Sequence, residues 1–122
     1  MVQQTTLSFT QGDAYSIVRT VTGFQQNDPI ARAWFTVKRS PQDSDANAVA
    51  QVQVTTTVTP LGYVVASGTV GMVYITVPAA TTALFDYREQ YWFDIQVATA
   101  SGLPYTPDWG IVQTRPGITG AT

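Results

Sequence analysis

The side chains that could do acid–base chemistry in this sequence are carboxylates, because the chain contains no histidine and no cysteine. Two pairs could in principle act as acid and base, as in a glycosidase: Asp86 with Glu89, and Asp94 with Asp108. The sequence does not fix the separation of either pair, and it has no GxSxG elbow and no Ser/Lys pairing. A capped turn at Asp86 and solvated carboxylates elsewhere are the simpler interpretation. We therefore predict a non-enzyme with no catalytic residue and no cofactor.

A second candidate for chemistry is the segment 43–47, DSDAN, which has the DxDxN opening of a calcium loop. The full motif needs glycine at its sixth position and a bidentate glutamate at its twelfth. This sequence has Ala48 and Val54 there instead. We predict an ordinary Asx-type turn in this segment and no metal site.

Two tryptophans indicate a contact surface. Trp34 and Trp92 both have the parity opposite to the apolar residues of their own segments, which would place the rings outward. If the two segments are neighbouring strands, the rings form an aromatic patch with a polar surround, suited to a protein contact or to sugar stacking. The predicted interface comprises Trp34, Trp92, Arg32, Lys38, Asp94 and Gln96. Burial of Trp34 on a central strand is an equal alternative, and Trp109 is predicted to be a loop anchor.

The strands that must position these residues follow from alternation with a period of two. The strongest pattern is at 91–114, where Tyr91, Phe93, Ile95 and Val97 share one parity. A turn at 100–102 and a return strand through 110–114 predict a long β-hairpin. Similar patterns predict strands at 7–9, 15–22, 31–39, 48–58, 63–65 and 68–77. Arg19 has the parity of the buried residues, which predicts either a strand end with a snorkelling side chain or a bulge.

Seven or eight short strands with turns about every ten residues predict an all-β, antiparallel β-sandwich in a single domain, 1–122. The immunoglobulin-like form is our first choice and a jelly roll the second, because spacing does not fix strand order. We expect one short helical crossover near residues 78–85, after Pro78, pinned by Leu84 and Phe85. Flexible ends are expected at about 1–6 and 115–122.

Composition narrows the classes of partner. The net charge is -2 and the pI about 4.6, which disfavours nucleic acid. Only 11% of residues are charged and Lys38 is the single lysine, so sheet edges lack their usual protection and we expect neighbouring subunits to cover them. No segment has the pattern of a membrane span or a signal peptide, which predicts a soluble protein without membrane contact.

The order of motifs resembles a family of small immunoglobulin-like proteins and domains from tailed bacteriophages. The matching segments are LSFTQGDAYSIVRTVTG at 7 to 23, AWFTVKRSPQDSDANA at 33 to 48, GMVYITVPAATTALF at 71 to 85 and YWFDIQVATASGLPYTPDWGIVQTRPGIT at 91 to 119. These proteins are virion structural components of the baseplate, tail-fibre anchor and related sites. In longer members such a domain is N-terminal and a receptor-binding region follows it, whereas we expect a single domain here.

This resemblance implies a non-enzymatic structural protein of the virion, assembled in the host cytoplasm. It would act by contacts with other virion proteins and with copies of itself in the tail, the baseplate or a fibre attachment. A capsid-surface decoration protein is the alternative. The third candidate is a carbohydrate-binding or adhesion module, which would contact host surface glycan.

Overall fold

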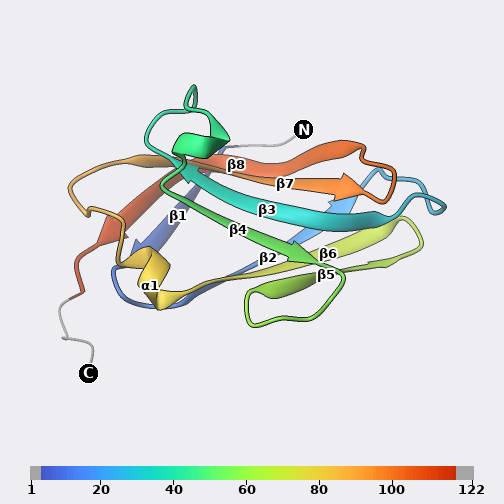
Figure 1. Ribbon diagram of the computed structural model, residues 1–122, viewed down its shortest axis with the longest axis horizontal. Coiled ribbons are helices and arrows are strands. Elements are labelled where there is room, and N and C mark those ends of the chain that lie inside the picture. The colour runs from blue at the N-terminus through green and yellow to red at the C-terminus, as the bar shows by residue number, and fades with distance from the viewer. Residues whose placement is uncertain (1–3, 118–122) are drawn as a thin grey trace.

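The computed structural model describes residues 4–117, and its regular secondary structure is almost entirely β-strand (Figure 1). The strands are β1 (Gln4–Thr10), β2 (Tyr15–Thr22), β3 (Ile30–Lys38), β4 (Ala50–Thr55), β5 (Gly62–Ser67), β6 (Val70–Val77), β7 (Tyr91–Thr99) and β8 (Pro104–Arg115). Two short helical pieces, the 3-10 turn η1 (Asp45–Asn47) and α1 (Ala79–Thr82), lie between strands. The predicted flexible ends overlap with these strands at residues 4–6 and 115, and their remainder at 1–3 and 118–122 lies outside the described residues.

The strands form two sheets, of order β1-β8-β7-β3-β4 and β2-β6-β5. This is the immunoglobulin arrangement, in which strands B, E and D face strands G, F and C. Here β2, β6 and β5 correspond to B, E and D, and β8, β7 and β3 correspond to G, F and C. β4 extends the sheet of β8, β7 and β3 as a C′ strand. The strand order therefore selects the immunoglobulin-like sandwich over the jelly roll. All strand pairs are antiparallel except β1 with β8, which is parallel. The chain crosses to the opposite sheet at the Gly12 turn, so β1 does not pair with β2 and pairs with the last strand instead.

Alternation along each strand builds the core between the sheets. The β7 side chains Tyr91, Phe93, Ile95 and Val97 are all buried, as the hairpin pattern predicts. Their counterparts across the sandwich, Val73, Ile75 and Val77 of β6, are at most 1% exposed. Aliphatic and aromatic side chains from all eight strands complete one continuous cluster, whose burial is the main source of stability.

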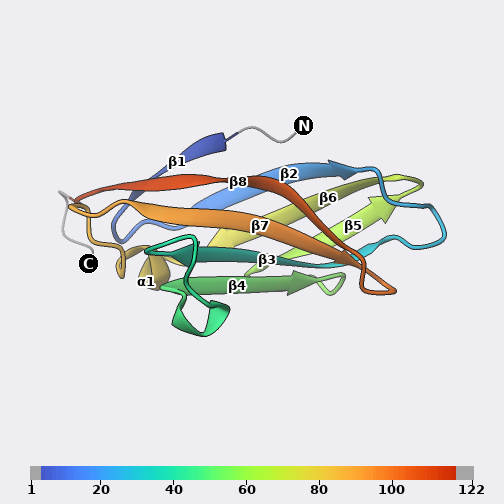
Figure 2. The same ribbon diagram turned by 90° about the horizontal axis from the view of Figure 1, so that it is seen from above.

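The helical crossover is confirmed, although it is shorter than the predicted 78–85. Phe85 is fully buried and pins it to the core, whereas Leu84 is 62% exposed and does not. Thr82 ties α1 to the β1–β2 turn, because its hydroxyl accepts from the Gly12 N–H at 3.1 Å and donates to the Asp13 carbonyl at 2.8 Å. Figures 1 and 2 place α1 at the end of the molecule opposite the β7–β8 turn.

Arg19 is neither at a strand end nor on a bulge. It lies in the middle of β2, which pairs with β6 without a register shift, and its side chain points inward. Its Nε donates to Asp108 Oδ2 on β8 at 2.6 Å, so a salt bridge joins the two sheets. Thr5 of β1 donates to the other carboxylate oxygen at 2.7 Å. Arg19 therefore points inward because it has a buried partner, Asp108. The alternation within β2 alone does not reveal that partner.

Candidate functional site

The outer face of the five-stranded sheet carries all six predicted interface residues. β3 and β7 are hydrogen-bonded neighbours, which was the condition for the aromatic patch. Trp34 lies opposite Gln96, and Lys38 lies opposite Trp92. Thr36 and Asp94 form the pair between them. Both tryptophans are half-buried on the outside of the sheet, so Trp34 does not enter the core between the sheets.

A third tryptophan joins this face and was missed by the sequence analysis. Trp109 is part of β8 rather than a loop anchor, lies opposite Asp94 of β7 and is 39% exposed. Its neighbours Asp108 and Gly110 suggested a loop. Counting back along β8 from the buried Val112 would have found it, because Trp109 has the parity opposite to Gly110 and Val112.

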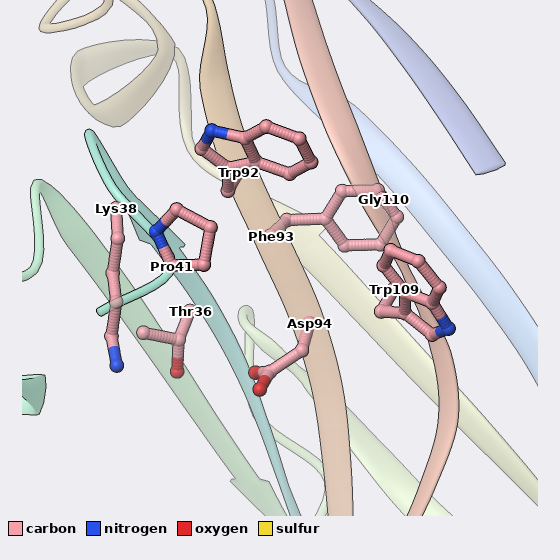
Figure 3. Close-up of a pocket in the computed structure, with 8 residues that line it drawn as sticks. All are labelled: Thr36, Lys38, Pro41, Trp92, Phe93, Asp94, Trp109 and Gly110. Atoms are coloured by element: carbon pink, nitrogen blue, oxygen red, sulfur yellow. The ribbon is translucent and has the colours of Figure 1, made fainter. Parts of the chain in front are cut away.

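A hollow of about 240 Å³ opens between the tryptophans of β7 and β8 (Figure 3). Trp92 and Trp109 stand on two sides of it, and the Asp94 carboxylate extends from β7 toward Thr36 on β3. Pro41, from the loop after β3, is on the far side. The complete lining is Thr36, Lys38, Pro41, Trp92, Phe93, Asp94, Trp109 and Gly110.

A second hollow of about 310 Å³ adjoins the first along β3 and β7. Thr36 and Asp94 line both hollows, so the two lie side by side on this face. The second is more polar, because its other walls are mostly amide and carboxylate side chains. These walls are Trp34, Asp45, Gln51 and Gln96. We call the joined hollows the tryptophan trough, with Trp92 and Trp109 at one end and Trp34 at the other.

Asp94 is the central polar group of the tryptophan trough. Partial exclusion of water raises the pKa of its carboxyl above the ordinary value, and the nearby positive charge of Lys38 opposes this rise. No described residue donates a hydrogen bond to its carboxylate. Lys38 itself is engaged by Asp45, whose carboxylate lies 2.9 Å from Nζ. Asp94 is itself exposed, so water still reaches its carboxylate, which is an available acceptor.

Trp34 is partly covered by its neighbour on the same face. The guanidinium carbon of Arg32 lies 5.9 Å from the centroid of the Trp34 ring, within the range of a cation–π interaction. This contact orients the indole at the polar end of the tryptophan trough. The Arg32 guanidinium also occupies one of the positions from which a cation of a ligand could approach the Trp34 ring.

The structure places Asp94 and Asp108 on opposite faces of their sheet and engages the Asp86 carboxylate in a turn. Asp94 points outward from its sheet, whereas Asp108 points into the sandwich and is bonded to Arg19. Asp86 is in a turn in which its carboxylate accepts from the Arg88 backbone at 2.9 Å and from the guanidinium at 3.0 Å. These bonds lower the pKa of Asp86, with the guanidinium bond the larger cause. Asp86 thus caps a turn, as the simpler interpretation predicted.

The DSDAN segment forms the loop before β4 and includes η1. Asp45 pairs with Lys38, and no group of three acidic side chains within residues 4–117 is arranged to hold a metal ion. No helix in the same described range has the length and apolar character needed to cross a membrane.

The outer face of the three-stranded sheet differs from the tryptophan trough in carrying no charge. The only charged side chain on β2, β5 and β6 is Arg19, which points inward. Tyr63 and Tyr74 stack on this face with ring centroids 4.6 Å apart. Val18 and Val65 are each 46% exposed. We call this surface the uncharged face; its large side chains are Val18, Tyr63, Val65, Val70, Met72 and Tyr74.

No family model matches this sequence, and no curated protein matches it. Among solved structures, the periplasmic chaperone SfaE is similar over 93% of this chain and 54% of its own, with a TM-score of 0.44 and 10% identity. Murine CRIg is similar over 92% of both chains, with a TM-score of 0.42 and 11% identity. At these values neither similarity bears on function, and the fold assignment rests on the strand order itself.

Proposed function

We propose that the protein is a non-enzymatic structural component of a tailed-phage virion, which acts by protein–protein contacts in the tail, the baseplate or a fibre attachment. The ordered motifs that resemble phage virion proteins support the class. The observation on which we base the mode of action is the uncharged face. A sheet face with several exposed large apolar side chains and no charge is unusual for a surface that stays in water.

The chemistry of the uncharged face suits a partner with an apolar surface. Val18, Val65 and Val70 are each close to half exposed, and Met72 and the tyrosine pair lie among them. Covering such side chains contributes about 25 cal/mol for every Å² of apolar surface removed from water. No desolvated charge would oppose the contact. The proposed occupant is therefore an apolar surface of a neighbouring virion subunit.

The edge strands support the same proposal. β1, β4 and β5 carry no charged side chain, although charge on an edge is a common protection against pairing with another chain. β5 combines such an edge with two residues of the uncharged face, Tyr63 and Val65. A neighbouring strand can add to β5 while its subunit covers the adjoining side chains.

Absence of catalysis is part of the proposal. Asp94 and Asp108 lie on opposite faces of their sheet, and Asp86 is held by Arg88 in a turn. Neither arrangement offers an acid and a base on two sides of a common substrate.

A charge introduced on the uncharged face tests the proposal. The purified protein is mixed with tails from which the native protein has been stripped. The Val65→Lys variant should not co-sediment with these tails, because the contact would bury an unpaired ammonium. Gln53→Lys, exposed on edge strand β4 in the other sheet, is the matched charge control and should still bind. Normal binding of Val65→Lys to tails would contradict the proposed contact. Binding of the wild-type protein to heads and not to tails would contradict the proposed location.

A further inference from the structure

The tryptophan trough is longer than a single pyranose ring. Its ends are marked on β3 by Trp34 and Lys38, the partner of Trp92. Four residues along a strand span about 13 Å. Because Thr36 and Asp94 border both hollows, a linear ligand of two or more rings can contact both hollows by passing over these two side chains.

The lining matches the two kinds of surface that a sugar presents. The apolar C–H face of a pyranose packs on a flat aromatic ring, and Trp92 and Trp109 supply two such rings. The hydroxyls around the ring need acceptors and donors. Asp94 is an acceptor without a donor among the described residues, and the Gln51 and Gln96 amides in the adjoining hollow can do both.

The charges in the tryptophan trough argue against charged ligands. A cationic ligand would meet the Lys38 ammonium in the first hollow, and the Arg32 guanidinium beside Trp34 in the second. An anionic ligand would meet Asp94 in both hollows and Asp45 in the second. A neutral ligand with many hydroxyls avoids both conflicts.

We propose that the tryptophan trough is a binding site for a neutral oligosaccharide, which stacks on Trp92 and Trp109 and donates hydroxyl hydrogen bonds to Asp94. The first hollow takes one sugar ring, and the chain continues past Thr36 toward Trp34. This inference goes beyond the proposed structural role, because it concerns the opposite outer face of the sandwich. The ligand class is set by the lining alone, so the site would act whether or not the protein is in a particle.

Binding can be measured with the full-length protein and a panel of neutral tri- to hexasaccharides built from glucose, galactose, mannose or N-acetylglucosamine. Titration calorimetry and tryptophan fluorescence give two readouts. We expect at least one of these oligosaccharides to bind and to change the indole emission. If none binds at millimolar concentration, or if choline or trimethyl-lysine binds instead, the proposal is overturned.

Variants locate the site. Trp92→Ala and Trp109→Ala should each weaken binding at least about tenfold, because tryptophans that become covered in a complex dominate the energy of such contacts. Asp94→Asn leaves the packing intact and should also weaken binding, since the amide cannot accept on both atoms. Tyr74→Ala, on the uncharged face, is the control and should bind normally. Unchanged affinity in Trp109→Ala and Asp94→Asn, with native thermal unfolding, would place any sugar elsewhere and refute the site.

The same variants separate this proposal from the structural one. Trp109→Ala should lose the oligosaccharide and keep its association with tails. Val65→Lys should lose tails and keep the oligosaccharide. Loss of tail association in Trp109→Ala, with oligosaccharide affinity unchanged, would show that the tryptophan trough is instead a protein contact.

Discussion

Arg19 and Asp108 connect the two sheets through the core side of the sandwich, with 2.6 Å between Arg19 Nε and Asp108 Oδ2. The carboxylate is the more deeply buried partner, since 6% of the Asp108 side chain is exposed against 29% of the Arg19 side chain. Thr5 donates to the same carboxylate. One acidic residue thus holds β1, β2 and β8 together, and it does so only while Arg19 compensates its charge.

The two partners should not be equivalent in mutagenesis. Arg19→Met leaves a buried carboxylate without its cation and should cost about 3 kcal/mol of unfolding free energy. Asp108→Leu leaves a guanidinium that can still reach water and should cost less. The double variant should recover part of the loss of Arg19→Met. Urea unfolding of the four proteins measures the differences, and equal costs for the two single variants would contradict this account.

Gly110 is required by the close approach of β1. A Cβ at this position would overlap the backbone carbonyl of Thr5, the residue that pairs with Gly110 in the parallel β1–β8 ladder. Gly110→Ala should therefore displace β1 and cost about 2 kcal/mol. Hydrogen exchange should show faster exchange in β1 and no change in β6. Gly102→Ala provides a comparison, because open space surrounds that position and only its positive φ of 101° is strained.

Asp28 fastens the loop before β3 to the β7–β8 turn. The Ser101 hydroxyl is the largest cause of a lowered pKa at Asp28, followed by the Ser101 backbone N–H, which donates at 2.9 Å; Thr99 also contributes. Because the pKa of Asp28 is lower in the folded than in the unfolded state, its ionised carboxylate stabilises the fold at pH values above the unfolded pKa. This stabilisation is lost as the pH falls through the folded-state pKa.

Asp28→Ala should consequently lower the melting temperature at pH 7, and the gap to the wild-type protein should narrow below about pH 4. Thermal unfolding at pH 7, 4 and 3 measures the gap. Asp43→Ala, whose side chain makes no hydrogen bond within the described residues, is the control and should show no such trend. A gap that stays constant from pH 7 to 3 would exclude the carboxylate as its origin.

Asp94 should behave in the opposite sense. Its pKa is raised in the folded state, which means that folding disfavours the ionised carboxylate. The ionised Asp94 therefore destabilises the fold at pH values above the folded-state pKa. This destabilisation disappears as the carboxylate is protonated. Asp94→Asn should raise the melting temperature at pH 7 only slightly, because water screens this exposed carboxylate, and the gain should vanish at pH 3. A lower melting temperature at pH 7 would show that Asp94 has a stabilising partner in the free protein.

The sequence predicted the sandwich because its strongest signals are local. Alternation at 91–97 and 73–77 placed the buried and outward side chains correctly. It indicated an outward Trp92, but it left burial of Trp34 as an equal alternative and did not show that the two strands are neighbours. It failed where the cause is a distant residue. Arg19 points inward because of Asp108, 89 positions away, and β1 runs parallel because β8 is its neighbour. Trp109 was assigned to a loop because it lies between Asp108 and Gly110, although the parity of β8 places it on the outer face.

The uncharged face and the tryptophan trough lie on the two outer surfaces of one sandwich, with the core between them. None of the large side chains of the uncharged face lines the trough. Substitutions in one surface can therefore accumulate without repacking the other. A scaffold of this kind can be retargeted by exchanging a few outward residues of β3, β7 and β8 while its opposite side remains unaltered.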